Sequence, residues 1–490
     1  MQPDCDLVED RCRNLPLRPY QRECAAWLAH RAYGLCALPM RAGKMLTTLA
    51  AAHAIGARKV LVICPAKART VWAREIAKWL GEESVLTYGR GGDKSRRWGE
   101  KRYTYGRAPE AFATIANYEI LIPHRAREAT GKRYEREDLP GWSTVFRQQK
   151  WDLVIIDESH EVRCWTRSKF KTTREAVLES CDQATCVWLL TGTPLVTSPR
   201  DYGSQLDIAS GGLYWYRGKP FSWDVRYCGA GRGQYGWELR QPTHVDELKK
   251  RLEVLMFQRS RAEILPDMPP KIRSVIRIEN DSPIPLSPNG APGERASKAM
   301  AATLKHKIPI LISNLEDEFR EGVKSIVFVH RRKSAEKVFR AVQKIKTPAK
   351  HWIVMGGSES ARDAACTSFV DHDGPGVLVA TIDTLDGAVS LRGATSEHWL
   401  EFHFNPTTML QAEDRPYEPD TRGLSILYYI LENSIDEHAE ERLLPKVEML
   451  AELSDKEQAA QFEVLGKKEF SSGLLEDVLA SMMEGFDCEE

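Results

Sequence analysis

The chain has 490 residues, of which 42% are hydrophobic and 28% charged, so it is long enough for roughly two to four domains with substantial cores. No stretch approaches the roughly 20 apolar residues of a membrane-spanning helix, and the acidic N-terminus lacks the pattern of a secretory signal. The eleven cysteines are scattered and form no Cys-x-x-Cys pair, which argues against a zinc ribbon and a disulfide framework. We therefore expect a cytoplasmic protein that is not secreted and has no membrane partner.

The formal net charge is zero, but the charges are unevenly distributed. Residues 90–150 contain 14 Lys and Arg against 8 Asp and Glu, a net charge of +6. Residues 447–490 contain 3 Lys against 12 Asp and Glu, a net charge of −9. A phosphate backbone responds to charge within a Debye length of about 8–10 Å, so the basic segment is a candidate DNA contact. An ordinary solvated insertion is an equal alternative.

Short apolar runs alternate with helix-like segments in the first half of the chain. We expect strands at residues 59–65, 152–157 and 186–191, and helices at 46–54, 70–79 and 171–178. Continuous apolar runs suit parallel strands that are covered on both faces. The alternation predicts an α/β doubly wound sheet, with ligand sites at the carboxyl ends of the strands.

A second set of strands follows a segment rich in proline and glycine. Residues 281–293 contain four prolines and two glycines, which predicts a linker. Further strands are expected at residues 324–330, 376–381 and 424–430. The predicted organisation is a first lobe at 1–280 with a basic insert at 90–150, a linker at 281–295, a second lobe at 296–450 and an acidic C-terminal tail at 451–490.

Residues 37–45 follow an apolar run and precede a helix-like segment, which is the setting of a phosphate-binding loop. Lys44 would reach the phosphates while backbone N–H groups at the helix start cradle them. The loop departs from the general pattern, because Leu38 replaces the first glycine and Met45 replaces the hydroxyl that holds Mg²⁺. A thioether does not suit this hard cation.

An acidic pair follows the expected strand at residues 152–157. Asp157 is suited to hold hydrated Mg²⁺, and Glu158 to orient or deprotonate an attacking water. A solvated acidic turn is the structural alternative. The wholly apolar run before the pair weakens that alternative, because the carboxylates then end a core strand.

Seven short motifs occur in a fixed order along the chain. They are residues 17–21, 64–72, 117–119, 157–160, 190–194, 327–330 and 411–415. Together they resemble the Swi/Snf-type helicase-like ATPases of helicase superfamily two. Residues 226–271 further resemble the annealing-helicase (HARP-like) subgroup. The resemblance covers about residues 14–447, and the compact layout is similar to versions carried by phages.

The resemblance implies two tandem RecA-like lobes with parallel sheets, ATP in the cleft between the lobes, and translocation on double-stranded or branched DNA. It assigns catalysis to Glu158 as base and Arg415 as arginine finger, with Gln411 beside it. It assigns Mg²⁺ to Asp157. ATP contacts are implied for Gln21 at the adenine and for Arg41, Gly43, Lys44, Thr191 and Gly387. DNA contacts are implied for Trp72, Asn117, Tyr118 and His330.

Three positions depart from the family pattern on the phosphate side. Arg41 replaces a glycine, Met45 replaces a threonine, and Glu418 replaces the second arginine of the last motif. Loss of an arginine finger costs about 10³- to 10⁵-fold in phosphoryl-transfer rate in nucleotide hydrolases. Two functions therefore remain open: a DNA-dependent ATPase that remodels DNA structures or bound proteins, and a degenerate ATPase that binds DNA or a protein such as RNA polymerase.

Overall fold

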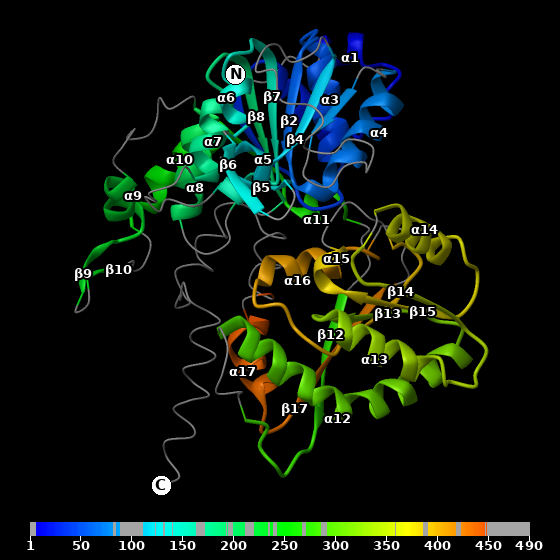
Figure 1. Ribbon diagram of the computed structural model, residues 1–490. Coiled ribbons are helices and arrows are strands. Elements are labelled where there is room, and N and C mark those ends of the chain that lie inside the picture. The colour runs from blue at the N-terminus through cyan, green and yellow to red at the C-terminus, as the bar shows by residue number, and fades with distance from the viewer. Residues whose placement is uncertain are drawn as a thin grey trace. The chain divides into compact units, whose positions relative to one another are not determined.

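The computed structural model describes residues 6–81, 85–88, 111–122, 124–130, 133–139, 141–162, 172–192, 194, 199–210, 220–233, 236–238, 243–266, 271–285, 292–357, 359–385, 391–417, 423–445 and 447. Over these residues the chain forms two compact units, which divide between Ile264 and Leu265 (Figure 1). Among the described helices, none combines the length and the apolar character that a membrane span requires.

A seven-stranded parallel sheet forms the centre of the first unit. In spatial order its strands are β11 (Met256–Gln258), β1 (Tyr33–Ala37), β8 (Ala184–Leu190), β7 (Trp151–Asp157), β2 (Val60–Cys64), β4 (Ala113–Asn117) and β3 (Val85–Tyr88). Every residue of β2 is buried, and Asp152 is the single exposed residue of β7. Both strands consist mainly of buried apolar residues, as expected for strands that helices cover on both faces of the sheet.

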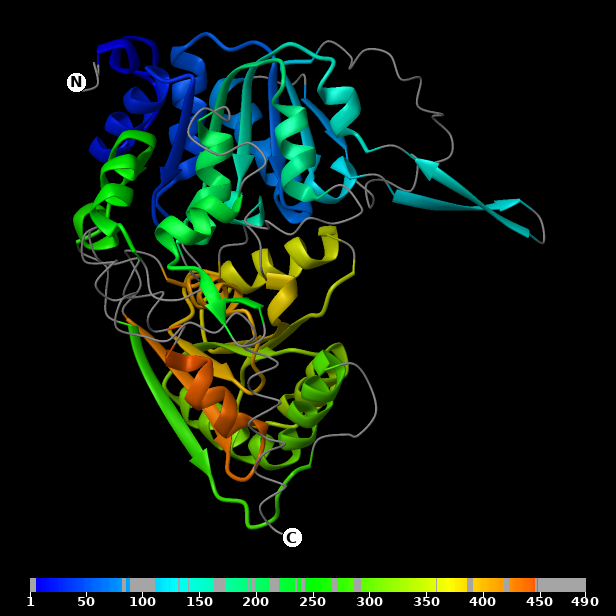
Figure 2. The same ribbon diagram turned by 90° about the vertical axis from the view of Figure 1, so that its left-hand side faces the viewer.

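The first unit also contains short helices and two antiparallel hairpins. The α-helices are α1 (Asp6–Arg11), α2 (Pro19–Ala29), α3 (Lys44–Ala54), α4 (Arg69–Leu80), α5 (Tyr118–Leu121), α6 (Ser143–Phe146), α7 (Thr173–Ser180), α8 (Arg200–Ala209), α9 (Pro220–Tyr227), α10 (Val245–Leu255) and α11 (Arg261–Ile264), with 3-10 turns η1 (Ala66–Ala68) and η2 (Ser159–Val162). The hairpins pair β5 (His124–Thr130) with β6 (Arg133–Leu139) and β9 (Gly231–Gly233) with β10 (Gly236–Glu238). The β5–β6 hairpin extends away from the sheet of its own unit (Figure 2).

The second unit is built on a six-stranded parallel sheet. In spatial order its strands are β12 (Lys271–Ile278), β17 (Leu424–Leu431), β16 (Ser396–Trp399), β13 (Lys324–Val329), β15 (Gly376–Thr381) and β14 (Lys350–Val354). Its helices are α12 (Pro292–Arg320), α13 (Arg332–Val342), α14 (Glu359–Val370), α15 (Ile382–Leu385), α16 (Pro406–Glu413) and α17 (Ile435–Arg442).

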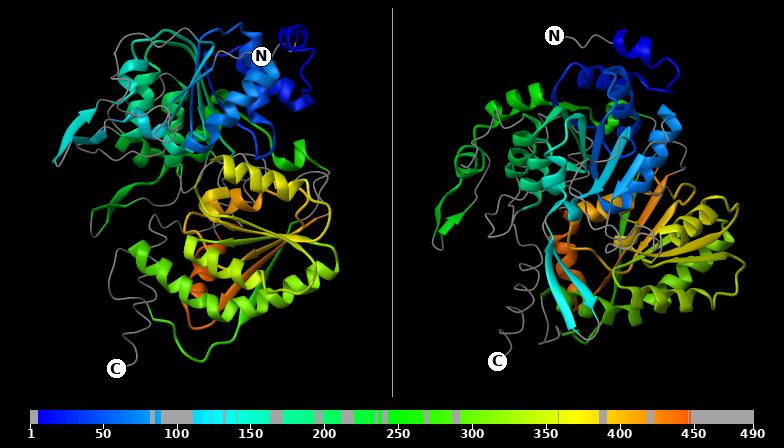
Figure 3. Two further views of the ribbon diagram at one scale, coloured as in Figure 1. Left: turned by 45° about the vertical axis from the view of Figure 1, so that its right-hand side comes forward. Right: turned by 45° about the horizontal axis from the view of Figure 1, so that its top comes forward.

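Alternate residues of the central strands build two separate cores, one on each face of this sheet. Ile326 and Phe328 of β13 pack with residues of α14, α16 and α17. Val327 and Val329 of the same strand pack with residues of α12 and α13. This alternation follows from the two-residue period of a strand, and helices accordingly lie on both faces of the sheet (Figure 3).

The predicted fold class, α/β with two parallel-sheet lobes, is confirmed. The strands expected at 59–65, 152–157 and 186–191 are β2, β7 and β8, and those expected at 324–330, 376–381 and 424–430 are β13, β15 and β17. The position of ATP between the lobes stays a prediction.

The division between the units differs from the predicted linker at 281–295. Strand β12 precedes that segment, yet it pairs along its whole length with β17 of the second sheet. Residues 281–285 therefore belong to a connection between β12 and α12 within the second unit. Prolines and glycines end an element, but they do not reveal which sheet the preceding strand joins.

Part of the basic insert expected at 90–150 belongs to the first sheet. Strand β4 lies inside the first sheet between β2 and β3, so residues 113–117 belong to the core of the unit. Among the described residues of this segment, those of the β5–β6 hairpin form a separate two-stranded sheet. Residues 89–110 and the acidic tail at 451–490 lie outside the described residues.

One ion pair is fully buried in the second unit. The Nζ atom of Lys307 on α12 lies 2.7 Å from Oδ2 of Asp436 on α17, and both side chains are 0% exposed. Lys307 also donates to the carbonyl of Leu400 at 2.6 Å. Burial lowers the pKa of Lys307 and raises the pKa of Asp436, so each charge depends on the other.

We expect Lys307→Met to lower the free energy of unfolding by about 3–5 kcal/mol, because it leaves a buried carboxylate without its counter-charge. Urea unfolding followed by circular dichroism measures this change. Lys298→Met on the same helix is the control, because Lys298 pairs with Glu294 at 2.8 Å in an exposed position, and no measurable change is expected. Equal stabilities of the two variants would show that the buried pair contributes nothing.

Candidate nucleotide site

The loop between β1 and α3 turns through two residues with left-handed backbone. Gly43, the N-cap of α3, has φ 70°, and a Cβ at this position would collide with the side-chain amide of Gln21. Arg41 has φ 65°, so the position that is glycine in the family pattern keeps a glycine-like backbone here. A left-handed conformation costs a non-glycine residue roughly 1–2 kcal/mol. The loop therefore has left-handed backbone at both positions, although one of them is not glycine.

Lys44 is held at the start of α3 by loop carbonyls. Its Nζ donates to the carbonyl oxygens of Leu38 at 3.1 Å and Pro39 at 3.3 Å. A Cβ built on Gly192 would lie 3.3 Å from the same Nζ, so the segment after β8 passes directly beside the ammonium group. The lysine thus lies at the carboxyl ends of β1 and β8, which are neighbours in the sheet.

The hydroxyl that Met45 lacks is not supplied by the threonines that follow it. Thr47 donates to the carbonyl of Gly43 at 3.0 Å, and Thr48 donates to the carbonyl of Lys44 at 2.8 Å. Both threonines are fully buried within α3. Hydroxyls that bond back to the preceding helical turn do not face the loop.

Gln21 connects α2 to the loop between β1 and α3. Its Nε2 donates to the carbonyl of Ala42 at 3.1 Å, and its Oε1 accepts the amide N–H of Arg18 at 2.8 Å. The hydroxyl of Tyr20 donates to the same Ala42 carbonyl at 3.1 Å. The side chain is buried, and the structure places it against the loop. Contact with adenine remains a prediction.

Asp157 is a buried carboxylate at the end of β7. Its Oδ2 accepts the indole N–H of Trp72 at 2.8 Å, and its Oδ1 accepts the amide N–H of Glu158 at 3.0 Å. Its backbone carbonyl accepts the hydroxyl of Tyr118 at 2.6 Å. Burial and the charge of Glu158 raise the pKa of Asp157 to about 6, against the opposing effects of Trp72 and Lys44.

The turn after Asp157 links the acidic pair to the end of β8. Glu158 has φ 51°, and its Oε2 lies 3.4 Å from Nδ1 of His160. The same Nδ1 lies 3.3 Å from the hydroxyl of Thr191. The chain segments that follow β1, β7 and β8 therefore meet at one edge of the sheet and bring together Lys44, Asp157 and Thr191.

Three of the residues predicted to contact DNA have buried side chains in this structure. Trp72 is 0% exposed, Asn117 3% and Tyr118 7%. Trp72 and Tyr118 hold Asp157, and the side-chain amide of Asn117 donates to Glu119. Trp72 exposes no surface to a ligand in this arrangement, and contact of these three residues with DNA stays a prediction. The sequence signal for the support of Asp157 is the tryptophan at position 72, because a buried indole N–H requires a hydrogen-bond acceptor.

In the second unit, helix α16 carries Gln411, and Arg415 follows the helix end. The helix is capped by Asn405, whose Oδ1 accepts the amide N–H of Thr407 at 3.0 Å. The backbone carbonyl of Arg415 accepts the amide N–H of Leu391 at 3.1 Å. Gly387 and Glu418 lie outside the described residues.

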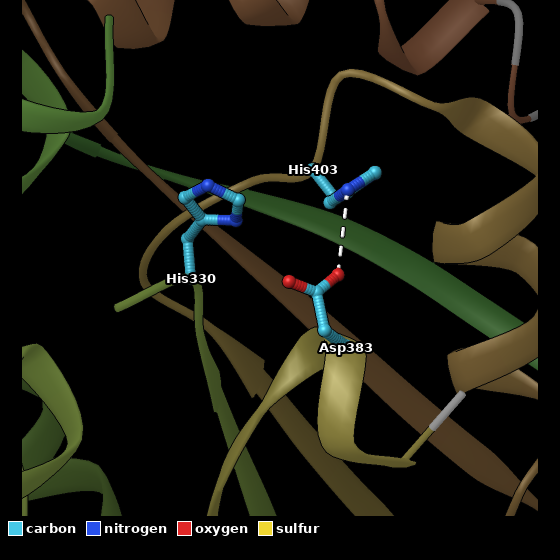
Figure 4. Close-up of side chains that lie close together, drawn as sticks. All are labelled: His330, Asp383 and His403. Carbon is cyan, nitrogen blue, oxygen red and sulfur yellow. Dashed lines mark ion pairs between the residues drawn. The ribbon is translucent and has the colours of Figure 1, made fainter. Parts of the chain in front are cut away.

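His330 lies with Asp383 and His403 at the carboxyl ends of three neighbouring strands (Figure 4). His403 Nε2 is 3.4 Å from Oδ1 of Asp383, and its Nδ1 accepts the amide N–H of Asn405 at 3.1 Å. A neutral His403 therefore carries its proton on Nε2, toward Asp383, and offers no lone pair to a metal ion in this arrangement. Burial and the neighbouring His403 lower the pKa of His330. Its contact with DNA stays a prediction.

Comparison with known proteins places these motifs in a family. A family model described as SNF2-related domain matches residues 20–282. The SWI/SNF-related matrix-associated actin-dependent regulator of chromatin subfamily A-like protein 1 of Drosophila melanogaster is 24% identical over 62% of this chain. The DNA annealing helicase and endonuclease ZRANB3 of Mus musculus is 23% identical over 87% of this chain. The chain spans 42% and 40% of the lengths of these two relatives.

Among solved structures, the Sulfolobus solfataricus SWI2/SNF2 ATPase core in complex with dsDNA is similar over 93% of this chain and 97% of that chain. The sequence identity is 18% and the TM-score 0.40.

We expect Trp72→Phe to weaken the metal site at Asp157, because outer-shell partners of metal ligands typically contribute about 10- to 100-fold to metal affinity. The Mg²⁺ concentration that half-saturates the ATP-induced rise in melting temperature should increase by about tenfold. Trp151→Phe is the matched control: it removes an indole N–H that donates to the carbonyl of Phe146 at 3.0 Å, at the opposite end of β7. An equal increase of the half-saturating Mg²⁺ concentration in both variants would show that the effect is general destabilisation.

Proposed function

Since this chain belongs to the SNF2-related domain family, whose model matches residues 20–282, we propose that it is a DNA-dependent ATPase that translocates on double-stranded DNA and remodels branched DNA or DNA-bound proteins. The main support is the convergence of Lys44, Asp157 and Glu158 at one edge of the first sheet. A phosphate-binding cation beside a metal-binding carboxylate and a candidate base is the arrangement that nucleotide hydrolysis requires.

Each candidate site residue of the first unit has a defined part in the proposed reaction. Lys44 and the amides around Gly43 hold the phosphates, while Gln21 contacts adenine. Glu158 orients or deprotonates the attacking water. It follows Asp157 directly, and its Oε2 lies 3.4 Å from Nδ1 of His160. Thr191 and Arg41 complete the phosphate side of the site.

The residues around Asp157 are suited to Mg²⁺. The donors of the site are carboxylate oxygens, the ligand type that this hard cation requires, and Mg²⁺ commonly takes one or two protein carboxylates together with waters and substrate phosphates. When bound, the ion would neutralise charge that develops on the phosphates. Trp72 and the Glu158 amide fix the orientation of the carboxylate that would hold it.

The proposal assigns Gln411 and Arg415 of the second unit to the γ-phosphate side of the reaction, with Gly387 contributing to ATP binding. His330 remains the proposed DNA contact. The net charge of +6 over residues 90–150 supports a nucleic-acid partner. The relative from Mus musculus is named a DNA annealing helicase, which supports duplex or branched DNA as the substrate.

The central test is ATP hydrolysis by the purified chain with and without duplex DNA. We expect DNA to stimulate turnover, and Lys44→Ala to abolish it. Glu158→Gln should reduce turnover by about 10²- to 10⁴-fold, because it removes the general base. It should retain the ATP-induced rise in melting temperature, because glutamine keeps the shape of the side chain. Glu253→Gln, at an exposed position on α10, is the control and should match the unchanged protein.

Two outcomes would contradict this assignment. Full activity of Glu158→Gln would exclude it as the base. DNA binding without any turnover above that of Lys44→Ala would indicate the alternative function, a helicase-like fold that serves as a DNA- or protein-binding module.

Met45 provides a second, independent test of the metal site. Met45→Thr should lower the Mg²⁺ concentration for half-maximal turnover by about three- to tenfold, because it restores an oxygen ligand at the start of α3. Met45→Leu is the matched control, since it conserves volume without adding oxygen and should leave the Mg²⁺ dependence unchanged. If the threonine variant requires as much Mg²⁺ as the leucine variant, the ion does not reach this position.

A further inference from the structure

Strand β12 carries two cations whose partners lie at the end of helix α16. Lys271 pairs with Asp414, and the side chains are 8% and 3% exposed. Arg273 donates from Nη2 to Oε2 of Glu413 at 2.7 Å and from Nε to the same oxygen at 3.2 Å. Lys271 and Arg273 are two residues apart on a strand, so they lie on the same face.

Burying these two carboxylates without a counter-charge would cost free energy of folding. Glu413 is fully buried, and its second oxygen accepts the hydroxyl of Tyr428 on β17. Asp414 is 2% exposed. A third buried carboxyl, Glu397, has its pKa raised by burial and by the charge of Glu413, which favours its neutral form. Two cations on β12 thus match two ionised carboxylates on the α16 end.

The two ion pairs with β12 involve the residues directly before Arg415 in the sequence. Glu413 and Asp414 lie between Gln411 and Arg415, the two residues of this segment assigned to the γ-phosphate. Residues 411 and 415 are about one helical turn apart, whereas residue 413 points to the opposite side of the helix. The contact of Arg273 with Glu413 therefore holds the α16 end from the side opposite Gln411. The contact of Lys271 with Asp414 holds the C-cap residue directly before Arg415, whose carbonyl accepts the amide N–H of Leu391.

We propose that Lys271 and Arg273 are positioning residues, which orient Arg415 and Gln411 through their ion pairs with Asp414 and Glu413. This inference rests on the proposed ATPase function. A purely structural role would lower the melting temperature of a variant without changing turnover by the folded protein. A positioning role lowers kcat, because a small displacement of a catalytic group can cost as much as about 10²-fold in rate.

The test is DNA-stimulated ATP hydrolysis by the full chain, with kcat and KM for ATP measured separately. Lys271→Met should lower kcat by about 10- to 100-fold and leave KM within about twofold, because the proposed ATP-binding residues Gln21 and Lys44 are intact. Lys271→Arg, which keeps the charge, should recover most of the activity. Arg277→Met is the matched control on the same strand: Arg277 pairs with Glu440 at 2.7 Å in an exposed position, and kcat should be unchanged.

A double variant tests whether Lys271 acts through Arg415. Adding Lys271→Met to Arg415→Ala should cause no further loss of kcat, since the group being positioned is already absent. Multiplicative losses would contradict the proposal. Asp414→Asn removes the charge of the same pair with an isosteric side chain and carries the same expected loss, so the proposal stays testable if Lys271→Met does not fold.

The outcomes separate this inference from the function on which it rests. An inactive wild-type chain would overturn both. A DNA-stimulated wild type, together with folded Lys271→Met and Asp414→Asn variants of unchanged kcat, would overturn the positioning role alone.

Discussion

The arrangement of the first unit depends on one buried carboxylate, Asp157. An ionised group at 5% exposure is costly unless donors surround it. Its carboxylate accepts the indole N–H of Trp72 on α4 and the amide N–H of Glu158. Its backbone carbonyl accepts the hydroxyl of Tyr118 on α5, the helix that follows β4. Because β7, β2 and β4 are neighbours in the sheet, the elements that follow them meet at the same edge. The strand order therefore determines where a metal ligand can be held.

In the second unit, buried carboxylates are stabilised by cations rather than by neutral hydrogen-bond donors. Its α16 end buries Glu413 and Asp414, and the edge strand β12 supplies Arg273 and Lys271. Ion pairs of this kind contribute little net stability compared with an apolar core, but removing one partner is strongly destabilising. Their effect is to allow a single orientation of the segment. In both units, buried acids thus fix elements that carry candidate catalytic groups.

The sequence predicted those parts of the fold that depend on continuous apolar runs. Strands β2 and β7 are buried along nearly their whole length, so their pattern was clear. Strand β12 was not predicted, because it alternates cations with apolar residues and Ile272 is 60% exposed at the sheet edge. The family motifs singled out Trp72, yet they did not tell that its indole N–H points to Asp157. Direction depends on packing from distant segments, which a motif does not contain.

At Met45 the local chemistry conflicts directly with the family pattern. The buried hydroxyls of Thr47 and Thr48 bond to the preceding turn of α3, so the helix itself offers no replacement oxygen. Asp157 then becomes the protein ligand on which a Mg²⁺ ion would mainly depend, with water and phosphate completing its coordination. A missing ligand of this kind weakens affinity for the ion before it disturbs the loop, whose left-handed turns at Arg41 and Gly43 are intact. We therefore expect hydrolysis to persist despite Met45, but to require a higher concentration of Mg²⁺.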